Sequence, residues 1–316
     1  MNGLQGGGVF ETPADGLTFG VVGPGKLGFA FVTALTKQKS LAWVVCRTEE
    51  SAMQIAEQFD WNVMAAADIA HVSGLPDVVI LTVPDAAIAV AARALAGAFG
   101  GQLAGKIVMH CSGAAGRGEL AECAAAGAVT IAAHPFQTFS GGSDTAFRGI
   151  AWGVECEPGA RDDAEAIVRR FGGMPVFLSN FTQTYRGLYH AAAVFASNFL
   201  TTVIASAKEA AAAAGIAPEE FLLPIITTAT ENALQILDRD VPAPLTGPVA
   251  RGDVETVERH IGEFAEVAPH LGFDYALMSR SAAELAKKQG FITAVEYSRL
   301  CTLLDEAIVA FRPPSE

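Results

Sequence analysis

The sequence predicts an α/β domain with a mostly parallel sheet, followed by a smaller all-α domain. In the first half, short apolar runs typical of buried strands alternate with helical patterns, which indicates βαβ units. After about residue 180 every predicted element is a helix. The chain has 316 residues, of which 51% are hydrophobic and 17% charged, so it can form two cores and is not a disordered chain.

The predicted strands are short runs rich in β-branched and apolar residues. Residues 77–83 (DVVILTV) form an almost continuous apolar run, as expected for a strand that helices cover on both faces. The strands are expected at 17–22, 42–46, 77–83, 106–111, 127–133, 150–156 and 175–178, with helices at 29–37, 49–59 and 86–99.

Apolar periodicity predicts five helices in the second half, at 181–214, 218–237, 254–267, 275–288 and 294–311. Asp253 is a suitable N-cap, Gly290 a suitable stop, and Pro224 should either kink its helix or mark its real start. We therefore expect a flexible glycine-rich tail (1–16), a dinucleotide-binding domain (17–180) and a helical domain for substrate binding and dimerisation (181–316).

The most lipid-like segment, 191–206, is interrupted by polar residues such as Ser197 and Asn198. It falls short of the roughly 20 apolar residues that span a bilayer, so we expect a buried helix and no membrane partner. The glycine-rich start lacks the pattern of a signal peptide.

The net charge of −13 and the lack of basic runs argue against a nucleic-acid partner and leave a small-molecule substrate. Five scattered cysteines without a C-x-x-C pair predict reduced thiols and a cytoplasmic location. Neither H-E-x-x-H nor an acidic cluster is present, so we expect no metal.

Residues 23–28 read G-P-G-K-L-G, directly after an apolar strand and at the start of a helix. Gly23 permits the tight turn, Gly25 lets the backbone approach a pyrophosphate, and Gly28 allows the helix to pack on the strand. The alternative is a glycine-rich turn without a ligand. The context favours a Rossmann-type sheet whose cofactor-binding residues include Gly23, Pro24, Gly25, Lys26, Leu27 and Gly28.

The choice of cofactor depends on the end of the second strand, where an acid would bind the ribose of NAD and an arginine a 2′-phosphate. Here Arg47 and Thr48 offer donors to a phosphate, and the following Glu49 and Glu50 can lie in the first turn of the next helix with Thr48 as its cap. NADP is therefore favoured over NAD. The alternative is an exposed Arg47 that pairs with a neighbouring glutamate.

Polar residues suited to hydride-transfer chemistry follow several strands at the same predicted sheet edge. His134, fixed by the following proline, is the preferred acid/base, because the pKa of histidine is normally near neutrality. Ser112 would orient the reactants, and His190 would complete the catalytic set. The alternatives are a structural histidine in a loop and a serine that only stabilises a turn.

Three further groups of residues border the expected ligand. Val83 and Pro84 end the third predicted strand and should border the nicotinamide ribose. Ser197 and Asn198 form a polar stripe with His190, either for substrate or for hydrogen bonds between helices. In the loop between two late helices, Thr246 and Arg251 could bind a substrate carboxylate; the alternative is a capped turn in which Arg251 pairs with Asp253.

Six motifs occur in a fixed order along the chain: GPGKLG, VPD, HCSGA, HPFQTFS, YHAAAVFASNF and LTGPVARGD. With them, residues 17–311 resemble Rossmann-like proteins whose second half is a helical domain of unknown function, within the 6-phosphogluconate-dehydrogenase-like superfamily. The resemblance implies NADP binding, with NAD or a deazaflavin less favoured, a cleft between the domains, and a homodimer formed through the helical halves.

Two details qualify what the resemblance implies. Many relatives use Lys-x-x-x-Asn on the first helix after the sheet, whereas this chain has Arg186-x-x-x-His190, so their mechanism does not transfer. Prephenate dehydrogenases are similar in two loops, at positions that Ser112 and His134 match. The prediction is an NADP-dependent oxidoreductase acting on a small, carboxylated carbonyl, imine or alcohol; the alternative is a non-catalytic NADP-binding sensor.

Overall fold

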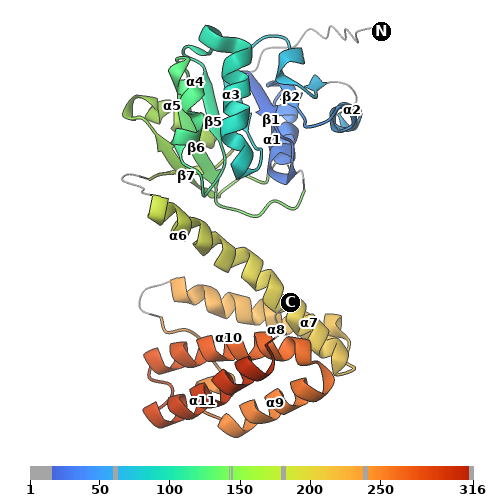
Figure 1. Ribbon diagram of the computed structural model, residues 1–316, viewed down its shortest axis with the longest axis vertical. Helices are drawn as coiled ribbons and strands as arrows, with labels where there is room; N and C mark the ends of the chain where they lie inside the picture. The colour runs from blue at the N-terminus through green and yellow to red at the C-terminus, as the bar shows by residue number, and fades with distance from the viewer. Residues whose placement is uncertain are drawn as a thin grey trace. The chain divides into compact units, whose positions relative to one another are not determined.

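The computed structural model describes residues 16–59, 63–141, 143, 145–178, 183–237 and 241–312. They form two compact units, one ending at Ser197 and the other beginning at Asn198 (Figure 1). The domain boundary expected near residue 180 and nearly all of the expected N-terminal tail lie outside the described residues.

In the described residues, eight strands form one sheet in the order β3-β2-β1-β4-β5-β6-β7-β8. All neighbours are parallel except the antiparallel pair β6–β7. Each strand expected from the sequence is present, and the two-residue β3 was missed because it is too short to carry a pattern. The strands are β1 (Phe19–Val22), β2 (Leu41–Val45), β3 (Ala65–Ala66), β4 (Val78–Leu81), β5 (Ile107–His110), β6 (Val129–Pro135), β7 (Ala151–Cys156) and β8 (Met174–Phe177).

Successive residues of the central strands face opposite sides of the sheet, and each side has its own apolar cluster. Val21 belongs to one cluster and Val22 to the other, as do Ile80 and Leu81. This double burial explains the continuous apolar runs in the sequence. The helices of this unit are α1 (Lys26–Lys37), α2 (Glu49–Gln58), α3 (Ile88–Phe99), α4 (Ala121–Ala125), α5 (Arg161–Arg170) and α6 (Gln183–Val194).

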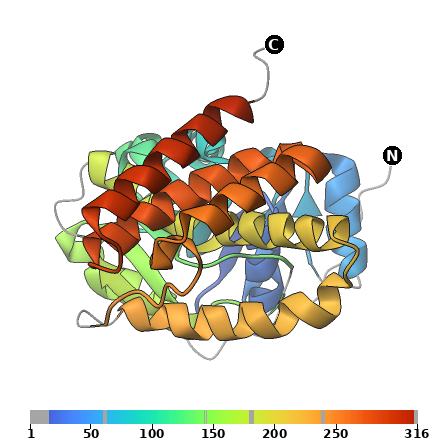
Figure 2. The ribbon, with the colours of Figure 1, turned by 90° about the horizontal axis from the view of Figure 1, so that it is seen from below.

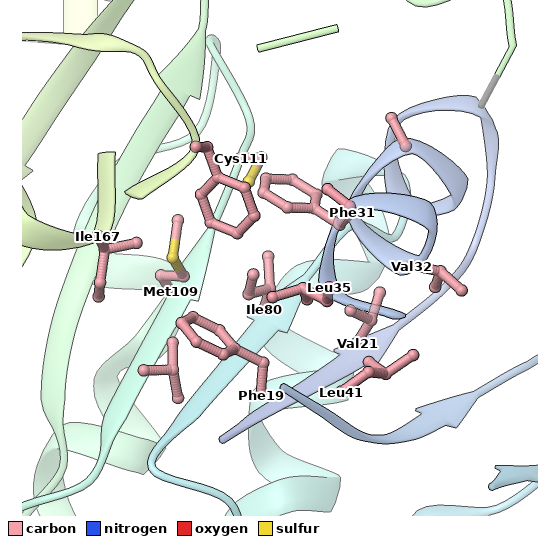
Figure 3. Packing of buried hydrophobic residues seen from close by; sticks show 14 of the residues in the cluster. Phe19, Val21, Phe31, Val32, Leu35, Leu41, Ile80, Met109, Cys111 and Ile167 are labelled. Atoms are coloured by element: carbon pink, nitrogen blue, oxygen red, sulfur yellow. The ribbon is translucent and has the colours of Figure 1, made fainter. Parts of the chain in front are cut away.

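The first cluster anchors α1 to the sheet (Figure 3). Phe31 of α1 is fully buried, and its ring lies 4.4 Å from that of Phe147 and 5.0 Å from that of Phe171, measured between centroids. Aromatic pairs at such distances add to the stabilisation that burial of their area provides. Because α1 is fixed in this way, the loop before it, which ends β1, has a defined position.

The second unit contains α7 (Leu200–Ala213), α8 (Pro218–Leu234), α9 (Val254–Val267), α10 (Pro269–Lys288) and α11 (Ala294–Ala310). Helices α9, α10 and α11 lie side by side around one apolar cluster (Figure 2). Asp253 caps α9 as expected, since its carboxylate accepts from the Thr256 amide at 3.1 Å. Gly290 follows α10 with φ +75°, as expected of a stop. Pro224 lies inside α8, so the alternative that it marks the start of this helix is wrong.

Helical structure continues from α6 through a π-turn (Phe195–Phe199) into α7. In the part of the chain that the structure describes, two helical stretches, Asp85–Leu103 and Thr184–Ala213, are long and apolar enough to span a membrane by length and composition alone. The first covers the sheet and buries Ile88, Ala92 and Leu95 against it. The apolar window of the second has no buried residue, so the expectation of a buried helix over 191–206 was wrong for a single chain.

Candidate functional site

The glycine loop between β1 and α1 has the geometry that its three glycines predict. Gly23 has φ +84°, a conformation that favours glycine, and a Cβ there would lie 2.6 Å from Val83 Cγ1. A Cβ on Gly28 would collide with Thr82 Oγ1 and lie 2.6 Å from the Gly23 carbonyl oxygen. A Cβ on Gly25, in contrast, would meet nothing within 4 Å. The loop is therefore closed toward the protein and open only at Gly25.

The open side of this loop fits a phosphate group. Gly25 is the N-cap of α1 and, having no side chain, gives the helix no capping hydrogen bond. The first amides of a helix need acceptors, and the helix dipole favours an anion at this end. Pro24 and Lys26 flank Gly25, and Lys26 is exposed at the first position of the helix. A pyrophosphate is the group that this arrangement suits.

The end of β2 provides the second part of a nucleotide site. Arg47 is exposed, and among the described residues the structure records no ion pair between it and Glu49 or Glu50. Both glutamates lie in the first turn of α2, and Thr48 caps this helix, as expected. The Thr48 hydroxyl accepts from the Ser51 amide at 3.2 Å and donates to Ser51 Oγ at 2.9 Å. Its proton is thus engaged, which leaves Arg47 as the stronger phosphate donor.

The turn after β4 backs the glycine loop. Thr82 donates its hydroxyl proton to the Gly23 carbonyl at 2.7 Å, and Val83 contacts Gly23 closely enough to exclude a side chain there. Val83 and Pro84 therefore lie beside the loop, at the carboxyl ends of parallel strands, where ligands bind in sheets of this type. Burial lowers the pKa of His110 and of His134, and the negative charge of Asp85 in the same turn opposes this lowering for both, so the turn lies close to the histidines.

The loop after β5 is held by His110 and Ser112. His110 is fully buried; its Nε2 lies 3.0 Å from the Gly116 carbonyl oxygen, and its Nδ1 accepts from the Ser112 amide at 3.2 Å. Ser112 Oγ accepts from the amides of Ala114 and Ala115 at 3.1 and 2.9 Å. The structure thus gives Ser112 the turn-stabilising role that was the alternative to a role in orienting substrate, although its hydroxyl proton can still be donated.

His134 lies at the end of β6, as expected, and is enclosed on several sides. Its Nδ1 is 2.9 Å from the Tyr189 hydroxyl of α6, and a Cβ on Gly113 would lie 2.9 Å from its ring. Burial lowers the pKa of His134 to about 4, and the nearby His190 acts in the same direction. The imidazole is therefore neutral at pH 7, which corrects the premise that its pKa lies near neutrality.

A small cavity of about 10 Å³ lies beside this pair, lined by residues that include Ser112, His134, Glu155, Arg186 and Tyr189. This is close to the minimum that one water molecule needs. Arg186 is buried, forms an ion pair with Glu155 of β7, and donates to the Ala115 carbonyl at 3.2 Å. Arg186 thus joins α6 to the sheet.

The remaining predicted residues on helices lie farther along the chain. The His190 ring is exposed, with its centroid 6.4 Å from that of His134. Ser197 donates to the Ala193 carbonyl at 2.6 Å, one turn earlier, so its hydroxyl is used within the helix. Asn198, in the π-turn, is exposed. Such π-turns are frequent at functional sites.

Thr246 and Arg251 belong to the helical unit and lie in the loop that leads to α9. Arg251 is exposed and donates to the Thr246 carbonyl at 2.7 Å. Asp253 uses its carboxylate to cap α9, as the alternative expected, but Arg251 bonds to the Thr246 carbonyl oxygen, and the structure, which describes both residues, records no ion pair between Arg251 and Asp253. Since one bond uses only part of the guanidinium, Arg251 retains donors for an anion.

Within the first unit, therefore, the fold brings together Ser112, His134 and His190, which the sequence predicted, with Tyr189, Arg186 and Glu155, to which it gave no role. Arg186 and Tyr189 are three residues apart and hence on one face of α6, a signal that could have found them. Glu155 lies in an ordinary strand pattern and gave no signal. In the described chain, no group of three or more potential ligands could hold a metal ion.

Two family models match the chain, a Rossmann-like domain over residues 8–135 and a domain of unknown function (DUF2520) over residues 150–282. This confirms the fold class and the resemblance predicted from the motifs. A search of curated proteins finds no match.

Solved structures with the same fold include a candidate NADP oxidoreductase from Bacteroides fragilis, with 24% identity, a TM-score of 0.69, and coverage of 85% of this chain and 98% of that one. An imine reductase from Streptomyces aurantiacus has 17% identity and a TM-score of 0.58, covering 91% of this chain and 99% of its own. A reductive aminase from Aspergillus terreus, in complex with NADPH and ethyl-5-oxohexanoate, has 18% identity and a TM-score of 0.56, with coverage of 93% and 94%. At these identities the similarity establishes the fold alone.

Proposed function

We propose that this chain, a Rossmann-like domain followed by a DUF2520 domain, is an NADP-dependent oxidoreductase. It would transfer a hydride to or from a small, carboxylated carbonyl, imine or alcohol. The observation that carries the proposal is the uncapped start of α1 at Gly25, which lies at the same edge of the parallel sheet as His134. The proposal includes a cytoplasmic location, because free cysteines suit a reducing compartment.

The residues of the first unit have distinct roles in this proposal. NADPH, when bound, supplies the hydride. The α1 amides bind its pyrophosphate and Arg47 its 2′-phosphate, while Val83 and Pro84 border the ribose next to the nicotinamide. His134, neutral at pH 7, forms a hydrogen bond with the reacting group or transfers a proton to or from it. The names of the similar structures, an imine reductase and a reductive aminase, favour a C=N bond among the candidate substrates.

Each unit contributes residues to the proposed binding of substrate. In the first unit, His190 and Ser197 would border the substrate. In the second unit, Asn198 would provide a polar group, and Arg251 with Thr246 would bind an anion such as a carboxylate. Arg251 suits this role because its fork of donors matches the two oxygens of a carboxylate.

The direct test of the function is a screen for NADPH oxidation at 340 nm. The candidate substrates are keto acids, cyclic imines, and ketones mixed with amines, and the proposal expects oxidation that depends on one of these classes. If NADPH binds but no member of any class is reduced, and no alcohol or amine reduces NADP⁺, the protein is instead a non-catalytic NADP sensor.

The role of Arg47 predicts a change in cofactor preference. In Arg47→Ala we expect the Kd for NADPH to rise roughly 10- to 100-fold, as the loss of hydrogen bonds to a charged group implies, and the Kd for NADH to stay unchanged. Fluorescence titration with both cofactors measures the two constants. Arg93, also on the sheet unit but in α3, provides the matched control Arg93→Ala, which should alter neither constant. An equal loss of affinity for NADH and NADPH in Arg47→Ala would contradict the role.

We also propose that two copies of the chain associate through the helical unit. Helix α8 has no buried residue, and Phe221, Leu223 and Ile225 are 59%, 68% and 63% exposed. Nearby, α7, α9 and α10 border an apolar groove of about 330 Å³. Exposed apolar side chains and an apolar groove of this kind are typical of an interaction site, and each copy offers both a helix and a groove to the other.

Association through α8 predicts that Leu223→Asp is monomeric. An aspartate that is buried in the interface without a partner weakens association by several kcal/mol. A loss of this size raises the Kd of a dimer from the micromolar to about the millimolar range. Sedimentation velocity should show a dimer for the wild-type protein and for the control Glu220→Gln on the same helix, and a monomer for Leu223→Asp. A monomeric wild-type protein would refute the association.

A further inference from the structure

Tyr189 is the polar neighbour of His134 whose position is defined by three separate contacts. Its hydroxyl lies 2.9 Å from His134 Nδ1, and its ring packs on Phe136 with 4.9 Å between centroids. The third contact is with β7, where a Cβ on Gly153 would lie 2.6 Å from the same hydroxyl. Since Gly153 pairs with His134 across β6 and β7, a glycine there leaves room for the hydroxyl directly beside the histidine.

The helix that carries Tyr189 is itself fixed at this point. Arg186, one turn earlier on the same face of α6, is 7% exposed, and it bridges Glu155 of β7 and the Ala115 carbonyl. A buried arginine held through both of its terminal nitrogens has little freedom, so the next turn is held at a constant distance from the sheet. The Tyr189 hydroxyl therefore meets the imidazole in one geometry.

Two neutral groups meet in this hydrogen bond. Burial raises the pKa of Tyr189 to about 12, although a hydrogen bond with the Gly153 backbone acts against the rise, and burial lowers the pKa of His134 to about 4. At pH 7 the phenol thus keeps its proton and the imidazole carries only one. A phenol is the better donor and a bare imidazole nitrogen the better acceptor, so the O–H donates to Nδ1 and the ring proton stays on Nε2.

We propose that Tyr189 is a positioning residue that fixes the Nε2–H tautomer and the ring orientation of His134. With Nδ1 occupied by Tyr189, Nε2 is the atom that His134 offers to a reacting group, and it offers a donor. The partner of one ring nitrogen determines what the other nitrogen can do, as in sites where an acid orients a catalytic histidine. The effect on turnover rests on the proposed function, but the tautomer does not.

The test is the variant Tyr189→Phe, which keeps the ring packed on Phe136 and removes only the hydroxyl. In protein labelled with ¹⁵N-histidine, long-range ¹H–¹⁵N spectra should show an unprotonated Nδ1 and a protonated Nε2 for His134, assigned with His134→Gln. Tyr189→Phe should convert this state to a mixture of tautomers. It should also lower kcat about 10- to 100-fold, the usual cost of losing such an orienting partner, with an unchanged Kd for NADPH.

A matched control exists in the helical unit, where the Tyr275 hydroxyl lies 2.8 Å from His260 Nδ1. Tyr275→Phe should change the signals of His260 and leave those of His134 unchanged. A protonated Nδ1 in the wild-type His134, or His134 signals that stay the same in Tyr189→Phe, would overturn the proposal. If the tautomer is as proposed but no substrate is turned over, only the proposed enzymatic function fails.

Discussion

Replacing Gly25 by valine is expected to abolish NADPH binding while the protein stays folded. Gly25 has φ −67° and ψ −164°, a conformation open to any residue, and its Cβ direction meets no atom within 4 Å. The new side chain would occupy the space through which a pyrophosphate approaches the α1 amides. We expect the Kd for NADPH to rise by at least about 100-fold, which corresponds to about 2.7 kcal/mol, as measured by fluorescence titration.

The control for this prediction is Gly97→Val in α3, another exposed glycine whose Cβ direction is empty. Both variants should keep the circular dichroism spectrum of the wild-type protein, because neither side chain collides with a neighbour. Gly97→Val should bind NADPH normally. Normal binding by Gly25→Val would mean that no phosphate lies at this helix start.

The second large effect is expected for turnover in His134→Ala. Acid–base groups typically contribute 10²- to 10⁴-fold, so on a substrate identified in the NADPH screen kcat should fall by about that factor. The Kd for NADPH should hardly change, because the loop at Gly23–Gly28 is intact. The control His71→Ala removes an exposed histidine in the short turn Ile69–His71 and should keep full activity.

The pH dependence of the wild-type rate follows from the lowered pKa of His134. Since its pKa is about 4, the imidazole remains neutral as the pH falls from 7.5 to 5.5 and becomes protonated only near pH 4. The rate-limiting step should therefore show no loss of the neutral imidazole at pH 6.5, where an ordinary histidine would titrate. If the rate of the wild-type protein changes around pH 6.5 and this change is absent in His134→Gln, the prediction that His134 stays neutral is wrong.

The sheet could be predicted from the sequence because its strands are buried on both faces. An apolar run such as residues 77–83 indicates a strand even when its neighbouring strands are not known. The glycines at 23, 25 and 28 mark the turn into α1. The helix α10 begins at Pro269, six residues before its predicted start. Proline is favoured in the first turn of a helix, but the sequence gives no apolar period there that would place the start.

The candidate site could be predicted only in part, because its members come from distant segments. His134 and Ser112 follow strands, so the rule that ligands bind at the carboxyl ends of strands places them. The spacing of Arg186 and Tyr189 places both on one face of α6, but their contacts with Glu155 and His134 join segments far apart in the sequence, which no local pattern encodes. The protonation state of His134 could not be predicted either. His134 was chosen because histidine normally titrates near pH 7, but burial lowers its pKa and keeps the imidazole neutral.

The central claim is that the backbone amides at the start of α1 bind the pyrophosphate of a nicotinamide dinucleotide, NADPH or NADH. Titration of the purified wild-type protein with NADPH and NADH, followed by nicotinamide fluorescence and by the shift in Tm, tests it most directly. We expect saturable binding of both cofactors, tighter for NADPH, with a rise in Tm as the ligand stabilises the folded state. The absence of a fluorescence change and of a Tm shift at millimolar concentrations of both would contradict the claim.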